Sequence, residues 1–334
     1  MKRLIPILLI AVMLLGLVAC GGGETPGGET PAQLKLGLGF VATAEATNAT
    51  ADTNGAGNMV VTVAAVLVDA DGKIAQIKID SVDLSAEYTA DGKAVAAASL
   101  KTKLELGDEY GMKGENSWES KHEWYEHAAA FEAACVGKTV AAIAGLADEA
   151  GKPGEALSGA GCTINVADFV KAVDAAVKNA TVTGATEKDT LKLGIATVQD
   201  TQDATADANG VNGFETTLFA AAVNAEGKMV AASMDTIAVE FAFDASGASK
   251  YDATVPVQSK KQLGDDYGMK GENPWESKHE WYEHAAAFEA ACVGKTAAEA
   301  AGLADEAGKP GETLSGAGCT VNVAAFLQAV AKVA

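Results

Sequence analysis

One stretch of sequence occurs twice in this chain, 157 residues apart, and this duplication limits the possible folds more than any other feature. Tyr110–Thr139 returns as Tyr267–Thr296 with one substitution, and Ala144–Thr163 returns as Ala301–Thr320, also with one substitution. Upstream of these segments the copies share little beyond the tetrapeptide Leu-Lys-Leu-Gly. Two copies at so long a period predict tandem domains of one fold rather than a solenoid.

The upstream half of each copy has the pattern of a β-sheet. Val60–Val68 is an apolar run rich in β-branched residues, Asp69–Gly72 has the composition of a turn, and side-chain polarity alternates over Ile74–Ile79. An Asp-Gly pair between two such runs is a strong hairpin signal. The second copy repeats the order with Leu218–Val223, Glu226–Gly227 and Met229–Met234.

The downstream half has the periodicity of helices. Apolar residues fall at helical spacing at Trp124, Ala128, Phe131 and Cys135, and Gly137 provides a stop. A second apolar stripe, which Asn165 is expected to cap, consists of Val166, Phe169, Val170, Val173 and Val177. We therefore expect an α+β protein with two tandem sheet-then-helices domains, over residues 34–180 and 191–334.

The first 19 residues have the form of a secretory signal peptide. Lys2 and Arg3 precede a mostly apolar run, which is shorter than the roughly 20 residues that a membrane span needs. A small-residue cleavage site then ends in Cys20, which we expect to be the lipidated first residue of the mature chain. Residues 20–33 are rich in Gly, Pro, Thr and Glu and predict a flexible tether. The expected location is the extracellular face of the cell membrane, held only by the lipid anchor.

The charge balance argues against one class of partner. The chain has 45 acidic and 25 basic residues, a net charge of −20. Such a polyanion repels phosphate backbones, so no nucleic-acid partner is expected. The hydrophobic fraction of 49% is that of a globular protein rather than a disordered one.

Several enzyme signatures fail on spacing. His122 and His127 are one residue too far apart for a zinc helix of the form His-Glu-x-x-His, and residues five apart point in different directions on a helix. Gly137-Lys-Thr lacks the earlier glycine of a phosphate-binding loop, because that position is Glu132. We therefore expect no metal site, expect the histidines to be solvated helix residues, and leave open whether the chain is an enzyme.

Four cysteines follow Cys20, two in each copy. Pairing Cys135 with Cys162 and Cys292 with Cys319 would give one disulfide per copy, which the compartment expected from the leader permits. Small buried free thiols are the alternative, and both stay open at this stage.

A short glycine-rich loop precedes the last predicted helix of each copy and is the segment best suited to hold a ligand. Small residues let a ligand approach the backbone closely, and a helix N-terminus attracts phosphate. The candidate binding residues are Gly161, Cys162 and Thr163 in the first copy and Gly318, Cys319 and Thr320 in the second. A loop that only leads into a core helix is the alternative reading.

The chain resembles the FMN-binding domains found in subunits of sodium-pumping and Rnf-type electron-transport complexes. It is closer still to the tandem flavinylated lipoproteins of Gram-positive extracellular electron transfer, and the resemblance covers most of each copy. The segments that carry it are Lys-x-x-Leu-Gly-Asp-x-Tyr-Gly-Met at Lys103 and Lys260, Glu-Trp-Tyr-Glu at Glu123, Gly-Lys-Thr at Gly137, and the loop-to-helix segments from Thr163 and Thr320.

In that family the last threonine of a motif Asp-x-x-Ser/Thr-Gly-Ala-Thr carries FMN through a phosphoester bond. The resemblance implies covalent FMN on Thr163 and Thr320, two per chain, although Leu157 and Ala160 stand where the motif has Asp and Ser/Thr. It also implies an FAD-dependent flavin transferase, a membrane quinone-linked reductase and extracellular electron acceptors as partners. The expected function is that of an extracellular electron carrier without substrate turnover. The alternative is a flavin-free surface lipoprotein acting as a binding or structural module.

Overall fold

The computed structural model describes residues 32–114, 120–271 and 277–334. The expected signal peptide, the lipidation site at Cys20 and most of the tether over residues 20–33 lie outside the described residues and stay expectations. The chain divides into Met1–Pro31 and one compact unit, Ala32–Ala334. The fold of this unit is α+β, with two antiparallel sheets and several helices.

The first sheet is formed by β1 (Lys35–Thr47), β2 (Gly55–Val68), β3 (Ile74–Tyr88) and the short β4 (Thr181–Val182), in the order β3-β2-β1-β4. The hairpin predicted at Asp69 is confirmed. The Asp69 carboxylate accepts the backbone N–H groups of Asp71 and Lys73, and Gly72 takes the left-handed conformation that the turn requires.

The second sheet consists of β5 (Thr190–Gln202), β6 (Gly210–Val223) and β7 (Met229–Phe243), in the order β5-β6-β7. Its predicted hairpin is also confirmed, although both strands are longer than the apolar runs that indicated them. The first strand of each sheet, β1 and β5, was not predicted. β1 begins at the lysine of the Leu-Lys-Leu-Gly tetrapeptide that the copies share, and β5 begins one residue before that tetrapeptide.

The helices follow each sheet in the same order in both copies. Those of the first copy are α1 (Lys103–Leu106), η1 (Gly107–Tyr110), α2 (Trp124–Cys135), α3 (Val140–Ala144), α4 (Glu155–Gly159) and α5 (Ala167–Lys178). Those of the second are α6 (Lys260–Leu263), η2 (Gly264–Tyr267), α7 (Trp281–Cys292), α8 (Ala297–Ala301), α9 (Glu312–Gly316) and α10 (Ala324–Ala331). Among the described residues, none of these helices has the length and apolar character that crossing a bilayer requires.

The predicted stripe of α2 is confirmed, because all four of its apolar residues are buried. Glu123 and Glu126 form a capping box at its start, and Gly137 lies just beyond its end with φ +76°. The prediction of Asn165 as the N-cap of α5 was wrong. Val166 occupies that position, and the Asn165 side chain accepts the N–H of Ala167 at 2.9 Å from one residue further out.

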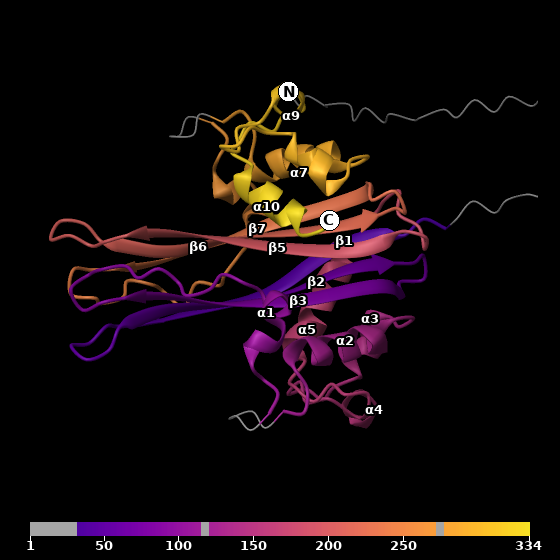
Figure 1. The fold of residues 1–334 in the computed structure, drawn as a ribbon, viewed down its shortest axis with the longest axis horizontal. Coiled ribbons are helices and arrows are strands. Elements are labelled where there is room, and N and C mark those ends of the chain that lie inside the picture. The colour runs from indigo at the N-terminus through magenta and orange to yellow at the C-terminus, as the bar shows by residue number, and fades with distance from the viewer. Residues whose placement is uncertain (1–31, 115–119, 272–276) are drawn as a thin grey trace, which may run out of the picture. The chain divides into compact units, whose positions relative to one another are not determined.

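The two sheets pack face to face, and the helices of each copy cover the outer face of its own sheet (Figure 1). This layering follows from the two-residue period of a strand, which sends alternate side chains to opposite faces. In β2, one set lies in the core between the sheets and consists of Met59, Val61, Val63, Ala65 and Leu67. The other set packs under the helices of the first copy and consists of Ala64, Val66 and Val68.

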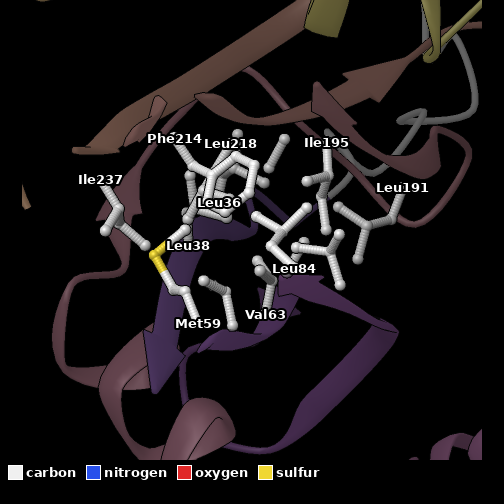
Figure 2. Close-up of a cluster of buried hydrophobic side chains, with 14 of the residues drawn as sticks. Leu36, Leu38, Met59, Val63, Leu84, Leu191, Ile195, Phe214, Leu218 and Ile237 are labelled. Atoms are coloured by element: carbon white, nitrogen blue, oxygen red, sulfur yellow. The ribbon is translucent and has the colours of Figure 1, made fainter. Parts of the chain in front are cut away.

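The core between the sheets is built from both copies (Figure 2). Leu36, Val63 and Leu84 come from the first copy, and Ile195 and Leu218 come from the second, all of them buried. The two copies therefore share the hydrophobic core between the sheets, and each also packs a separate buried cluster under its own helices.

The glycine of the shared tetrapeptide has a packing reason in both copies. A Cβ at Gly37 would lie 2.0 Å from the Ala176 carbonyl oxygen, and a Cβ at Gly194 would lie 2.2 Å from the Ala329 carbonyl oxygen. Only glycine lets the last long helix of each copy approach its strand this closely.

Candidate functional site

Thr163 and Thr320 are exposed residues in the loops that join α4 to α5 and α9 to α10. Each follows a glycine with φ near +105° (+104° at Gly161 and +105° at Gly318) and a buried cysteine. Both threonines lie four residues before their helix begins, so they are outside its first turn. Phosphate bound there would not lie on the helix N-terminus that the sequence suggested.

The loop is held in place by hydrogen bonds to the turn at Ala150 and Gly151. The Asn165 amide donates to the Ala150 carbonyl at 2.7 Å, and the Val166 N–H donates to the Gly151 carbonyl at 2.9 Å. In the second copy Asn322 donates to the Ala307 carbonyl at the same 2.7 Å. The loop conformation is thus fixed by side chains and backbone that both copies contain.

A buried histidine holds the threonine end of each loop. His127 is 0% exposed, and its Nδ1 lies 2.8 Å from the Gly161 carbonyl oxygen and 3.3 Å from the Thr163 backbone nitrogen. Its Nε2 lies 3.1 Å from Ser120 Oγ. The second copy has the same contacts around His284, at 2.8, 3.3 and 3.0 Å.

The expectation that the histidines are solvated helix residues was therefore wrong for His127 and His284. Position 127 follows Trp124 by three residues and precedes Phe131 by four, so it lies on the buried face that these two residues define. That signal was present in the sequence. Burial lowers the pKa of the His127 imidazole below its ordinary value of 6.5, and the Gly161 carbonyl offsets this only in part. The pKa of His284 is lowered for the same reason.

The other histidine of each copy lies outside the helix and close to the first. His122 precedes the N-cap of α2, so the helical spacing that separated it from His127 does not apply. The two rings meet edge to face with centroids 5.6 Å apart, and His122 Nδ1 lies 3.6 Å from Glu126 Oε1. Within the ranges that the structure describes, no group of three or more potential metal ligands is present.

A cleft of about 660 Å³ opens at Thr320. Its lining residues are Met269, Ser277, Lys278, His279, Ser315, Gly318, Thr320, Val321 and Asn322. A second cleft of about 390 Å³ shares Met269, Val321 and Asn322 with it and extends to Lys260 and Trp281. These volumes lie within the range of small-molecule sites, and the lining mixes apolar side chains with a few polar ones, as such sites do.

The four cysteines within the described residues, Cys135, Cys162, Cys292 and Cys319, are buried free thiols. Burial raises the pKa of Cys135 and Cys292 to about 12 and that of Cys162 and Cys319 to about 11, so the thiols stay protonated at neutral pH. Of the two alternatives, one disulfide per copy or buried free thiols, the structure shows the free thiols. Cys319 does not line the cleft that its neighbours Gly318 and Thr320 help to form.

A buried carboxylate also supports the first short helix of each copy. Asp80 Oδ1 accepts the N–H of Leu104 at 3.2 Å, and Asp235 Oδ1 accepts the N–H of Lys261 at 3.2 Å, so each carboxylate holds the start of α1 or α6. Burial raises the pKa of Asp80 to about 6 and raises that of Asp235 above its ordinary value. Neither aspartate was singled out in the sequence, where nothing links a mid-strand Asp to a helix some 24 residues later.

The chain matches no family model, no curated protein and no solved structure. No family membership is therefore shown.

Proposed function

We propose that the chain is an electron carrier with FMN joined through its phosphate to the hydroxyl of Thr320 and, in the first copy, of Thr163. Each copy then acts as an FMN-binding domain, and the lipid-anchored chain carries electrons from a membrane quinone-linked reductase to extracellular acceptors. The observation that carries the proposal is an exposed threonine hydroxyl in the wall of a cleft of about 660 Å³.

The residues of the cleft suit the two ends of FMN. Lys278 and His279 line the same cleft as Thr320 and would hold a phosphate group. A Cβ at Gly318 would meet nothing nearer than His279 Nε2 at 3.9 Å, so the glycine leaves open space beside the threonine. Met269 and Val321 offer apolar surface to a ring system. Bound FMN would supply the ability to accept electrons in a pair and release them singly.

The attachment step needs FAD and a flavin transferase. The threonine oxygen forms a bond to the FMN phosphorus, the bond from that phosphorus to the bridging oxygen of AMP breaks, and AMP leaves with the proton that the hydroxyl gives up. Nothing is oxidised or reduced, and each site gains the mass of FMN less one water. A covalent link keeps the cofactor on a protein that works outside the cell, where a dissociated flavin would be diluted.

Intact mass after co-expression with an active flavin transferase tests the proposal. We expect a gain of two FMN less two waters and a yellow colour that survives denaturation. Thr163→Ala and Thr320→Ala should each remove one FMN. Thr313→Ala is the matched control, because this exposed hydroxyl in α9 has alanine as its counterpart in the first copy. Retention of both flavins in the Thr163→Ala, Thr320→Ala double variant would reject these sites.

One observation favours the alternative of a flavin-free surface lipoprotein. Leu157 and Leu314, which stand where the related motif has aspartate, are core residues at 1% and 0% exposure. An apolar side chain there packs the loop onto the helices and offers a transferase no carboxylate. Unmodified peptide mass, apart from lipid, in material from the native host would support this alternative.

A further inference from the structure

The Nδ1 atom of each buried histidine faces two backbone groups that make opposite demands. The Gly161 carbonyl can only accept a hydrogen, and it lies 2.8 Å from His127 Nδ1. The Thr163 N–H can only donate one, and its nitrogen lies 3.3 Å from the same atom. A ring nitrogen either carries a proton or accepts one, so it satisfies only one of these groups at a time.

The other side of the ring indicates which form makes which bond. Ser120 Oγ donates to the His122 carbonyl at 2.6 Å, so its oxygen is left to accept from His127 Nε2–H. With the proton on Nε2, the neutral ring accepts the Thr163 N–H through Nδ1. The doubly protonated ring keeps the bond to Ser120 and donates from Nδ1 to the Gly161 carbonyl. Gain of one proton therefore exchanges the partner of Nδ1 without disturbing Nε2.

The charged surroundings of the ring are the same in both copies. His127 is close to His122, Glu123 and Glu126 on the helix side, and Lys113 lies 3.9 Å from Glu126. From the loop it meets the Gly161 carbonyl and the Thr163 N–H. In the second copy the corresponding groups are His279, Glu280, Glu283 and Lys270. One copy can therefore serve as a control for the other within a single chain.

We propose that His127 and His284 are positioning residues of the attachment loops. The neutral ring holds the amide of Thr163 or Thr320 and fixes the threonine for modification, and protonation moves the ring to the glycine carbonyl and releases the threonine amide. The effect on flavin loading rests on the proposed function. The exchange of hydrogen-bond partner at the Thr163 and Thr320 backbone amides does not depend on that function.

Site-resolved loading in variants of the second copy tests the loading effect. Asn at position 284 keeps a side-chain oxygen near the place of Nδ1 but does not titrate, whereas Phe fills the space with no acceptor. In His284→Phe, we expect loading of Thr320 relative to Thr163 to fall about fivefold, the effect of one lost hydrogen bond. In His284→Asn, the loading of Thr320 relative to Thr163 should match the wild type at pH 8. This ratio should rise as the pH falls to 5, because Thr163 is still held by a histidine that becomes protonated, whereas Thr320 is held by an amide that does not titrate.

The ratio within one chain cancels the pH dependence of the transferase. Equal losses in His284→Asn and His284→Phe would mean that the ring acts only by filling space, and they would overturn the proposal. An unchanged ratio in His284→Phe would overturn it as well.

Amide hydrogen exchange in the full, flavin-free chain gives a readout that needs no loading. We expect the Thr320 and Thr163 amides to be protected at pH 8 and to lose protection as the pH falls below the histidine pKa, beyond the intrinsic change in exchange rate. In His284→Asn only the Thr320 amide should keep its protection. If protection of the Thr163 and Thr320 amides in the wild type did not change with pH, the positioning role would be overturned, even if loading occurs. Absence of loading with the expected exchange pattern would reject the proposed function and leave the positioning role intact.

Discussion

The two copies agree far more closely in sequence in their helical halves than in their sheets. In the helical halves, Tyr110–Thr139 and Ala144–Thr163 each differ from the second copy at one position, and the histidine contacts agree to within 0.1 Å between copies. The sheets share little sequence, yet their strands have the same lengths of 13, 14 and 15 residues. A strand needs only alternating polarity to find its place, whereas the loop needs particular side chains at particular positions.

The divergence of the sheets also makes them fit each other. Gly57 and Asn212 occupy corresponding positions of β2 and β6. A Cβ at Gly57 would lie 2.0 Å from the Phe241 ring of the second copy, so glycine makes room for that ring. Asn212 instead reaches into the first copy and donates to the carbonyls of Glu87 and Val95, at 2.8 and 2.9 Å. Two identical sheets could not make both contacts, because the same position would have to be glycine in one sheet and asparagine in the other.

The largest effect should come from removing the ring that Gly57 accommodates. Phe241 is 0% exposed in the core between the sheets, and Phe241→Ala should lower the free energy of unfolding by about 3–5 kcal/mol. Because the core is shared, we expect a single unfolding transition in urea, followed alike by signals from both copies. Val255→Ala, at a side chain that is 59% exposed, is the control. Two separate transitions would mean that the copies close independent cores.

A smaller loss should follow from cutting the polar link between the sheets. Asn212→Ala removes a fully buried partner of the Glu87 and Val95 carbonyls and of the Gln199 amide, and should cost about 2 kcal/mol by urea denaturation. Asn209→Ala changes the same residue type in the exposed loop just before β6 and should stay within about 0.5 kcal/mol of the wild type. Equal effects of the two substitutions would contradict a role for Asn212 in joining the copies.

The same contrast explains what the sequence could predict. The hairpins and the stripe of α2 follow from local periodicity, and both were confirmed. The shared core could not be inferred, because β2 is apolar on both faces and a pattern does not show whether helices or a second sheet cover each face.

The site was predictable only in part. Thr163 and Thr320 stood out because their loop is rich in small residues, but the cleft brings together residues from segments that are far apart in sequence, such as Met269, Ser277 and Thr320. The burial of His127 and His284 could have been predicted from the helical period, which places them on the apolar face of their helices. The contact between His127 Nδ1 and the Gly161 carbonyl could not be predicted, because it depends on the position of a backbone group 34 residues later in the chain.

The last effect depends on pH and concerns the buried aspartates Asp80 and Asp235, which differ in their neighbours. Burial raises the pKa of Asp80 to about 6 from 3.8, and Glu105 adds to the rise. The folded state therefore binds the proton more tightly than the unfolded state, so this group's contribution to stability is present below pH 3.8 and is lost as the pH rises through 6. At Asp235 the nearby Lys261 opposes the effect of burial.

The wild type should therefore lose stability relative to Asp80→Asn as the pH rises from 4 to 6. The difference in their unfolding free energies should change by at most about 1.4 kcal/mol per pH unit. Asp235→Asn should give a shallower slope, because Lys261 favours the ionised form. Urea denaturation at several pH values measures both slopes, and a steeper slope for Asp235→Asn would mean that Lys261 does not compensate for burial there.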